Sequence, residues 1–243
     1  TLKALDVVDM LEAFAAQGSR VTILDRDPAG AEFAERCNRQ IGRVRFMLVD
    51  LTDEAALVRA LEDAQRVDGT VDVLINNAGY DPRYDITRMS MQQWDELFRL
   101  NIGHYFVTCR ELIPAMKARN EAEGKGASII LVSSVNWWLG GGDLTCYTAT
   151  KAAALGMMKS LAAEVGRWKI RVNALAPGWT MTDRQLKELV TPEIKKKLVE
   201  EMQLLPELLT PENLAPAFLF LGSDASRMIT RQTLLVDAGL ARG

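Results

Sequence analysis

A tyrosine and a lysine four residues apart are the most informative pair in the sequence. Tyr147 and Lys151 have the spacing i, i+4, which places both side chains on one face of a helix. A phenol has a reference pKa of about 10, so it is a poor base at neutral pH unless a nearby cation stabilises the phenolate. Ser134 precedes this helix and ends a predicted strand, where its hydroxyl could bond the same substrate oxygen. Together the three residues indicate proton transfer at a substrate oxygen.

Several other polar segments follow predicted strands. The segment 76–79 (Asn-Asn-Ala-Gly) ends one strand and the segment 177–182 (Pro-Gly-Trp-Thr-Met-Thr) ends another, while Asp25 and Asp50 end two more. Doubly wound sheets bind their ligands at the carboxyl ends of parallel strands. The joint placement of these segments therefore predicts a ligand site at that edge.

The elements that must position these residues are short β-rich runs, each followed by a segment of helical periodicity. The predicted strands are 21–24, 44–49, 71–75, 128–132, 170–175 and 233–236. Helix starts are predicted at Thr52, at Ser90 with Gln93 as a capping box, and at Thr210-Pro211. This alternation predicts an α/β fold with right-handed crossovers, a three-layer, doubly wound parallel sheet of the Rossmann-like type.

The chain shows no linker or repeat that would divide it, so we expect a single domain over residues 1–243. The segment 182–206 interrupts the strand–helix alternation. Thr191-Pro192-Glu193 opens a second short helix there, so the segment is predicted to be a small helical insertion. A mobile lid and a rigid packed insertion both fit this pattern.

Composition excludes several classes of function. The chain is 48% hydrophobic and 25% charged with a net charge of −3, which is typical of a globular protein and argues against a nucleic-acid binder. No apolar run approaches the roughly 18 residues needed to span a bilayer, and no signal peptide is evident, so we expect a cytoplasmic protein. The single histidine, His104, excludes a His-rich metal site, and we expect it to pack in the core.

On these motifs the sequence resembles the short-chain dehydrogenase/reductase family over essentially its whole length. The resemblance implies a catalytic tetrad of Asn101, Ser134, Tyr147 and Lys151. Tyr147 would be the general base for oxidation, and Lys151 would lower its pKa and hold the nicotinamide ribose. Ser134 would orient the substrate oxygen, and Asn101 would hold a water in a proton relay to Lys151. The resemblance also implies a homo-oligomer, a dimer or tetramer, built on the helices that carry Asn101 and Tyr147.

The same resemblance implies the cofactor-binding residues. Besides Tyr147 and Lys151 they are Asp25, Asp50, Leu51, Asn77, Ala78, Gly79, Pro177, Gly178, Thr180 and Thr182. Asp25 matches the acid that accepts hydrogen bonds from the ribose hydroxyls. Because a carboxylate there would repel a 2′-phosphate, NAD is expected rather than NADP, although Arg26 could soften that exclusion.

One departure from the family concerns the pyrophosphate. The family begins with a strand and a glycine-rich turn, TGxxxGxG, whose backbone N–H groups bind the pyrophosphate, and the sequence contains no such motif. Residues from Ala4 onward already have the pattern of the helix that follows the turn. We therefore expect the first strand and its loop to be missing between about residues 3 and 8.

Three loops are expected to line the substrate site, those following Gly79, Ser134 and Gly178. Their candidate substrate-binding residues, together with Ser134 and Tyr147, are Arg83, Asn136, Trp138, Trp179 and Gln185. These loops resemble the branch of the family that oxidises aldoses at C1, which implies a pentose or hexose such as xylose, arabinose, galactose or fucose and an aldonolactone product. The tryptophans could equally pack between loops or at a subunit contact.

Two alternative functions remain open at this point. One is reduction of a ketone or 3-oxoacyl thioester with NADPH, against which the acid at Asp25 speaks mildly. The other is a catalytically silent dinucleotide-binding protein, which the missing glycine loop favours and the complete tetrad disfavours.

Overall fold

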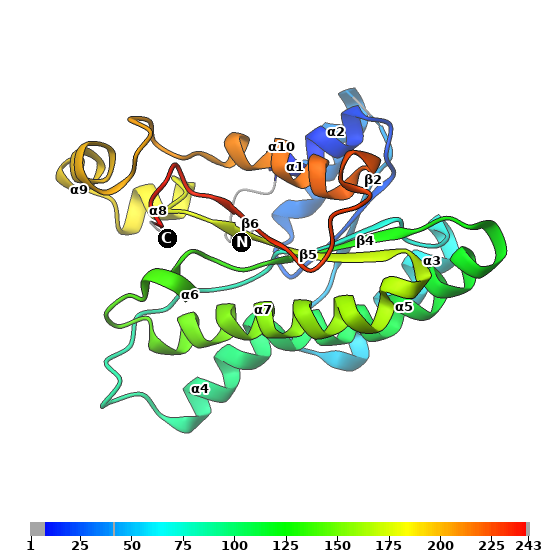
Figure 1. Cartoon of the computed structure of the whole chain (residues 1–243), viewed down its shortest axis with the longest axis horizontal. Coiled ribbons are helices and arrows are strands. Elements are labelled where there is room, and N and C mark those ends of the chain that lie inside the picture. The colour runs from blue at the N-terminus through cyan, green and yellow to red at the C-terminus, as the bar shows by residue number, and fades with distance from the viewer. Residues whose placement is uncertain (1–7, 41, 242–243) are drawn as a thin grey trace.

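The computed structural model describes residues 8–40 and 42–241, in which strands alternate with helices (Figure 1). The strands are β1 (Val21–Asp25), β2 (Val44–Leu48), β3 (Val73–Asn76), β4 (Ala127–Val132), β5 (Ile170–Pro177) and β6 (Thr233–Val236). The longer helices are α1 (Val8–Ala16), α2 (Ala29–Gln40), α3 (Glu54–Asp68), α4 (Met91–Phe98), α5 (His104–Glu123), α7 (Thr145–Val165) and α10 (Pro211–Gly222). The short helices are α6 (Asn136–Leu139), α8 (Asp183–Glu188) and α9 (Pro192–Lys197), with π-turns η1 (Arg99–Gly103) and η3 (Leu198–Met202) and 3₁₀ turns η2 (Gly166–Trp168) and η4 (Asp224–Ser226).

All strand pairs are parallel, which confirms the predicted fold class. In the described residues they form two sheets, β1–β2 and β3–β4–β5–β6, rather than the one continuous sheet expected from the sequence. A doubly wound sheet has the strand order 3-2-1-4-5-6, so its first strand belongs between β1 and β3. That strand and its glycine loop are what we predict to be missing near residues 3–8, and residues 1–7 lie outside the described part of the chain.

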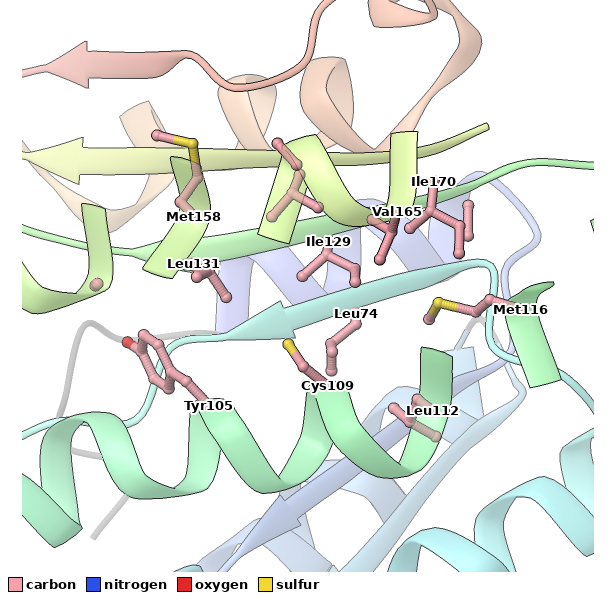
Figure 2. Packing of buried hydrophobic residues seen from close by; sticks show 14 of the residues in the cluster. Leu74, Tyr105, Cys109, Leu112, Met116, Ile129, Leu131, Met158, Val165 and Ile170 are labelled. Atoms are coloured by element: carbon pink, nitrogen blue, oxygen red, sulfur yellow. The ribbon is translucent and has the colours of Figure 1, made fainter. Parts of the chain in front are cut away.

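Helices cover both faces of the four-stranded sheet. Strand β4 shows this directly, because its successive side chains point to opposite faces. Ile129 and Leu131 pack with α3, α5 and α7, whereas Ile130 and Val132 pack with α1, α2 and α10. Figure 1 shows α5 and α7 below the sheet and α10 above it, and Figure 2 shows the row of buried side chains that α5 presents to β3 and β4. The molecule is therefore a three-layer structure with a core on each side of the sheet.

Local hydrogen bonds explain where the helices start. Ser90 and Gln93 form the predicted capping box before α4. Helix α3, however, is capped by Asp53 and not by Thr52: the Asp53 carboxylate accepts from the Ala56 N–H at 3.0 Å. Thr52 is instead held by Asp50, whose carboxylate accepts from both the N–H and the hydroxyl of Thr52.

Two short helices, α8 and α9, occupy the segment that interrupts the alternation. Thr182 caps α8 by accepting from the Gln185 N–H at 3.2 Å, and Thr191 caps α9 by accepting from the Ile194 N–H at 3.3 Å. Because α8 follows directly after β5, it lies at the carboxyl edge of the sheet. The caps therefore place the side chains of α8 next to the predicted ligand site.

None of the described helices is long and apolar enough to cross a membrane. The same residues contain no group of three or more His, Cys, Asp or Glu side chains that could hold a metal ion. His104 is buried, and its ring meets the Tyr105 ring edge-on at 4.6 Å. Burial and the charge of Lys151 lower the pKa of His104 from 6.5 to about 3.

This lowered pKa predicts a loss of stability in mild acid. Between pH 6.5 and about 4 the unfolded chain binds a proton on His104 that the folded chain does not bind, so the free energy of unfolding should fall by about 1.4 kcal/mol per pH unit. Urea denaturation at a series of pH values measures this slope. In His104→Leu this part of the slope should disappear, and parallel profiles for the two proteins would contradict the assignment.

Candidate active site

The four predicted catalytic residues come together at the carboxyl edge of the sheet. Ser134 follows β4 by two residues, Tyr147 and Lys151 occupy the first turns of α7, and Asn101 lies in the π-turn η1. The hydroxyl of Ser133 donates to the Lys151 carbonyl at 2.8 Å, which fixes the start of α7 against the end of β4. Three segments that are distant in the sequence therefore meet at one point.

The ammonium group of Lys151 is buried. The side chain is only 3% exposed, and its Nζ donates to the Val132 carbonyl at 2.9 Å and to the Tyr105 hydroxyl at 3.4 Å. Nζ also lies 5.8 Å from the centroid of the Tyr147 ring. Burial lowers the pKa of Lys151 to about 8, and the negative charge of Asp81 opposes this shift. The ammonium is therefore the main form at neutral pH, although it titrates close to that range.

The side chain of Ser134 acts directly on the phenol of Tyr147 and lowers its pKa. Burial has the larger effect and raises the pKa of Tyr147 to about 12. The lowered phenol pKa expected from the sequence is therefore absent from this arrangement, because desolvation of the phenolate outweighs the favourable contacts. The resting side chain is a protonated phenol that keeps part of its surface open to solvent, where a substrate oxygen could reach it.

Asn101 fixes the segment that follows β3. Its side-chain amide donates to the Tyr80 carbonyl at 2.9 Å and to the Thr150 hydroxyl at 3.2 Å, and its Oδ1 accepts from the Tyr80 N–H at 2.7 Å. The π-turn around it is a local feature that often marks functional sites. A Cβ at Gly79 would lie 3.2 Å from Lys151 Nζ, a tight contact that would crowd the ammonium.

The predicted cofactor-binding residues lie along the same edge. Asp25 ends β1, and burial is the main reason why its pKa is raised. Asp50 and Leu51 follow β2, and hydrogen bonds from Thr52 lower the pKa of Asp50. The segment 77–79 follows β3, and the segment 177–182 spans the end of β5 and the cap of α8.

The carboxylates of Asp25 and Asp50 follow two strands, and the buried ammonium of Lys151 contacts the end of a third strand. These groups fit the two ends of a dinucleotide, because its ribose hydroxyls need hydrogen-bond acceptors and donors. The pyrophosphate in the middle of such a ligand has fewer binding groups. The sequence contains no TGxxxGxG motif, and the first turn of α1, where a pyrophosphate would meet the helix dipole, contains Asp9.

The predicted substrate residues divide into two groups, those that follow β4 and β5 and the exposed Arg83. Trp179 donates from Nε1 to Gln185 Oε1 at 2.9 Å, so the loop after β5 and helix α8 present an aromatic ring and an amide together. Asn136 begins α6 and donates from its backbone N–H to Ser134 Oγ at 3.2 Å, while the Trp138 side chain is 54% exposed. Arg83 instead forms an exposed ion pair with Asp143 at 3.0 Å, beside a surface hollow lined by Arg83, Tyr84, Asp85, Ile86, Asp143 and Thr145.

Sequence reasoning missed an ion pair between Asp81 and Arg184. Their side chains are 17% and 12% exposed, and the Arg184 guanidinium stacks 4.8 Å from the Tyr80 ring centroid. Asp81 raises the pKa of Tyr147 and Arg184 lowers it, so both act on the phenol. The pair joins the loop after β3 to α8, and no spacing rule connects residues that are 103 positions apart. Tyr105 was missed as well, because it lies within an apolar helical pattern.

The contacts of Asn101 predict that Asn101→Ala affects stability and activity together. Three hydrogen bonds to Tyr80 and Thr150 are lost, so the free energy of unfolding should fall by about 1 to 3 kcal/mol and the Tyr80–Asp81 segment should loosen over the site. Asn173→Ala is the matched control. Asn173 lies in the amino-terminal half of β5 and is also a fully buried amide. Its side chain holds a distant loop by donating to the Ile229 carbonyl and accepting from the Gln232 N–H.

Denaturation and turnover measured on both variants check this prediction. Both variants should lose stability, but only Asn101→Ala should lose a large share of its kcat. Equal effects of the two substitutions on kcat would show that Asn101 has no special place in the site.

Comparisons with known proteins agree with this geometry. A family model described as "Enoyl-(Acyl carrier protein) reductase" matches residues 9–241. A probable galactose dehydrogenase of Rhizobium meliloti is 34% identical over 95% of this chain and 89% of its own length. A 3-oxoacyl-[acyl-carrier-protein] reductase of Chlamydia trachomatis is 36% identical over 94% and 90%, and a D-xylose 1-dehydrogenase of Caulobacter vibrioides is 35% identical over 93% and 87%.

A solved structure shows the same fold. The L-sorbose reductase of Gluconobacter frateurii, crystallised with NADPH and L-sorbose, superposes with a TM-score of 0.89 at 25% identity, covering 99% of this chain and 94% of its own. The tetrad geometry, the parallel α/β fold and the relatives all lead to one conclusion. The chain belongs to the short-chain dehydrogenase/reductase family and is an oxidoreductase that acts on CH–OH groups.

Proposed function

We propose that this protein oxidises the C1 hydroxyl of an aldose with NAD and releases an aldonolactone. The observation that carries the proposal is the phenol of Tyr147 beside the buried ammonium of Lys151, with the Ser134 side chain and the Asp81–Arg184 pair acting on the same phenol. The candidate substrates are pentoses and hexoses such as xylose, arabinose, galactose and fucose. The sugar names of the Rhizobium and Caulobacter relatives support this class.

The roles of the side chains follow from their contacts. The hydroxyls of Ser134 and Tyr147 bind the anomeric hydroxyl oxygen. Tyr147 first releases its own proton to solvent, and the phenolate then accepts the proton of the anomeric hydroxyl as the C1–O bond gains double-bond character. The buried ammonium of Lys151 stabilises this phenolate, because Nζ lies 5.8 Å from the centroid of the Tyr147 ring. When bound, an oxidised nicotinamide dinucleotide supplies the acceptor for the C1 hydride.

The polar pairs Asp81–Arg184 and Trp179–Gln185 suit a sugar. A pyranose presents several hydroxyls and an apolar C–H face, so its site needs charged or amide groups together with an aromatic ring. Asp81, Arg184 and Gln185 offer the polar groups, and Trp179 offers the ring.

The proposed cofactor is NAD. Asp25 would accept hydrogen bonds from the adenosine ribose, Asp50 and Leu51 would contact adenine, and residues 77–79 would lie under the ribose. Lys151 would hold the nicotinamide ribose, and Gly178, Thr180 and Thr182 would bind the carboxamide and pyrophosphate. The carboxylate of Asp25 favours NAD because it would repel a 2′-phosphate.

Replacing Tyr147 by phenylalanine tests the proposed base. With NAD and a panel of pentoses and hexoses, the parent protein should reduce the cofactor, and Tyr147→Phe should lower kcat by about 100-fold or more. Cys146→Ala is the control from the same turn, since its buried thiol contacts the Trp94 carbonyl and has no role in the chemistry. Turnover that survives in Tyr147→Phe would refute the assigned base.

The same panel separates the second candidate function. The relationship to the chlamydial 3-oxoacyl reductase favours ketone or 3-oxoacyl thioester reduction with NADPH. Activity on those substrates, with no oxidation of any aldose, would move the assignment to that reaction. Binding of the cofactor without turnover of either class would indicate a catalytically silent dinucleotide-binding protein.

Replacing Asp25 by serine tests the cofactor preference. Removing the carboxylate leaves Arg26 next to the ribose site, so the ratio of kcat/KM for NADP to that for NAD should rise by about tenfold or more. Initial rates with each cofactor at a saturating sugar concentration give this ratio. An unchanged ratio would show that Asp25 does not select the cofactor.

A further inference from the structure

Resting on the proposed function, we propose that Tyr105 is a positioning residue of this site. Its buried hydroxyl, anchored on the Val132 carbonyl, accepts a hydrogen bond from Lys151 and holds the ammonium beside Tyr147. Tyr105 acts only through Lys151, because its side chain is completely buried and cannot touch a substrate.

The Tyr105 hydroxyl, the Val132 carbonyl and the Lys151 ammonium are all hydrogen-bonded to one another. The Tyr105 hydroxyl donates to the Val132 carbonyl at 2.9 Å, and Lys151 Nζ donates to the same carbonyl at 2.9 Å and to the Tyr105 hydroxyl at 3.4 Å. A phenol has one proton to donate and lone pairs left to accept, so both bonds can exist together. Figure 2 shows Tyr105 in the row of α5 side chains, at the end nearest the carboxyl ends of the strands.

The Tyr105 hydroxyl is not needed to fill space. Phenylalanine would occupy the same volume, whereas a buried hydroxyl has a desolvation cost that must be offset by its partners. The His104 ring packs edge-on against the Tyr105 ring at 4.6 Å and fixes its orientation. The rigid ring and the β4 carbonyl therefore aim the acceptor at Lys151.

The charged and titratable groups that face Lys151 come from several elements. They are Tyr147 on its own helix, Tyr105 and His104 on α5, and Asp81 after β3, with Arg184 of α8 paired to Asp81. Burial raises the pKa of Tyr105 well above its usual range and keeps His104 neutral above about pH 3. Titration near Lys151 between pH 6 and 10 therefore reports on the lysine itself.

The test removes the hydroxyl with Tyr105→Phe and follows Lys151 without any cofactor. ¹³Cε-lysine NMR, with the resonance assigned through Lys151→Met, gives the titration midpoint of the ammonium. Loss of the acceptor destabilises the charged form, so the midpoint should fall by roughly half a pH unit to one unit. With NAD and an aldose, the alkaline limb of the kcat/KM profile should move to lower pH by the same amount, because the reaction needs the charged lysine.

Thr108→Val is the matched control, since Thr108 is a buried hydroxyl one turn further along α5. It contacts the Asn76 side chain and the backbone carbonyls of His104 and Tyr105, but neither Lys151 nor the Tyr105 hydroxyl. It should change stability without moving the Lys151 midpoint. An unchanged midpoint in Tyr105→Phe, or an equal shift in Thr108→Val, would overturn the proposal.

If Tyr105→Phe fails to fold, 3-fluorotyrosine in the parent protein provides a second measurement. The ¹⁹F signal of residue 105 is assigned by eliminating those of Tyr80, Tyr84 and Tyr147. Its chemical shift should change at the pH where Lys151 titrates. A chemical shift that does not change at this pH would overturn the proposal. Neither NMR experiment requires turnover. A shifted midpoint in a protein that oxidises no aldose would support the role of Tyr105 and reject the proposed function.

Discussion

The site depends on one electrostatic constraint, a lysine ammonium that stays charged where almost no water reaches it. A buried charge must be compensated by hydrogen bonds and opposite charge, and Lys151 obtains these from the Val132 carbonyl, the Tyr105 hydroxyl and the nearby carboxylate of Asp81. Each partner comes from a different element. Lys151 must be contacted at the same time by the end of β4, the start of α5 and the loop after β3. The same contacts therefore fix the positions of these elements and the chemistry of the site.

Several local features of the chain make room for the buried ammonium and hold the loop beside it in place. Gly79 has no side chain, which leaves room for the ammonium where any Cβ would press on it. The π-turn η1 turns Asn101 towards the Tyr80 backbone, so the loop carrying Asp81 is held by an amide and by the ion pair to Arg184. Because Arg184 lies on α8, the inserted helices are connected directly to the loop over the tetrad. Burial raises the pKa of Tyr147 to about 12 in this arrangement, so further positive charge is needed before the phenol releases its proton and can act as a base.

Local patterns in the sequence predict the strands, the capping box at Ser90 and the Tyr147–Lys151 pair, because each depends on spacing within one element or on its end. Asn101 was predicted only through the resemblance to the family. The cap of α3 was wrong by one residue, since Asp50 engages Thr52 and leaves Asp53 to cap the helix. The Asp81–Arg184 pair could not be predicted, because its partners come from opposite halves of the chain and meet only in the folded structure. Tyr105 has the sequence signature of an ordinary core residue, and only the position of the β4 carbonyl gives its hydroxyl a role.

The fate of the C1 hydrogen of the sugar shows whether Tyr147 acts as the base in oxidation at C1, because Tyr147 can take the hydroxyl proton only as that hydrogen leaves with its electron pair. A C1-deuterated aldose is incubated with NAD, and the reduced cofactor is examined by proton NMR. Oxidation at C1 beside the Lys151–Tyr147 pair predicts one deuterium on each nicotinamide ring and a primary isotope effect on turnover. Reduced cofactor that carries no deuterium, or a sugar that keeps its deuterium while the cofactor is reduced, would contradict it.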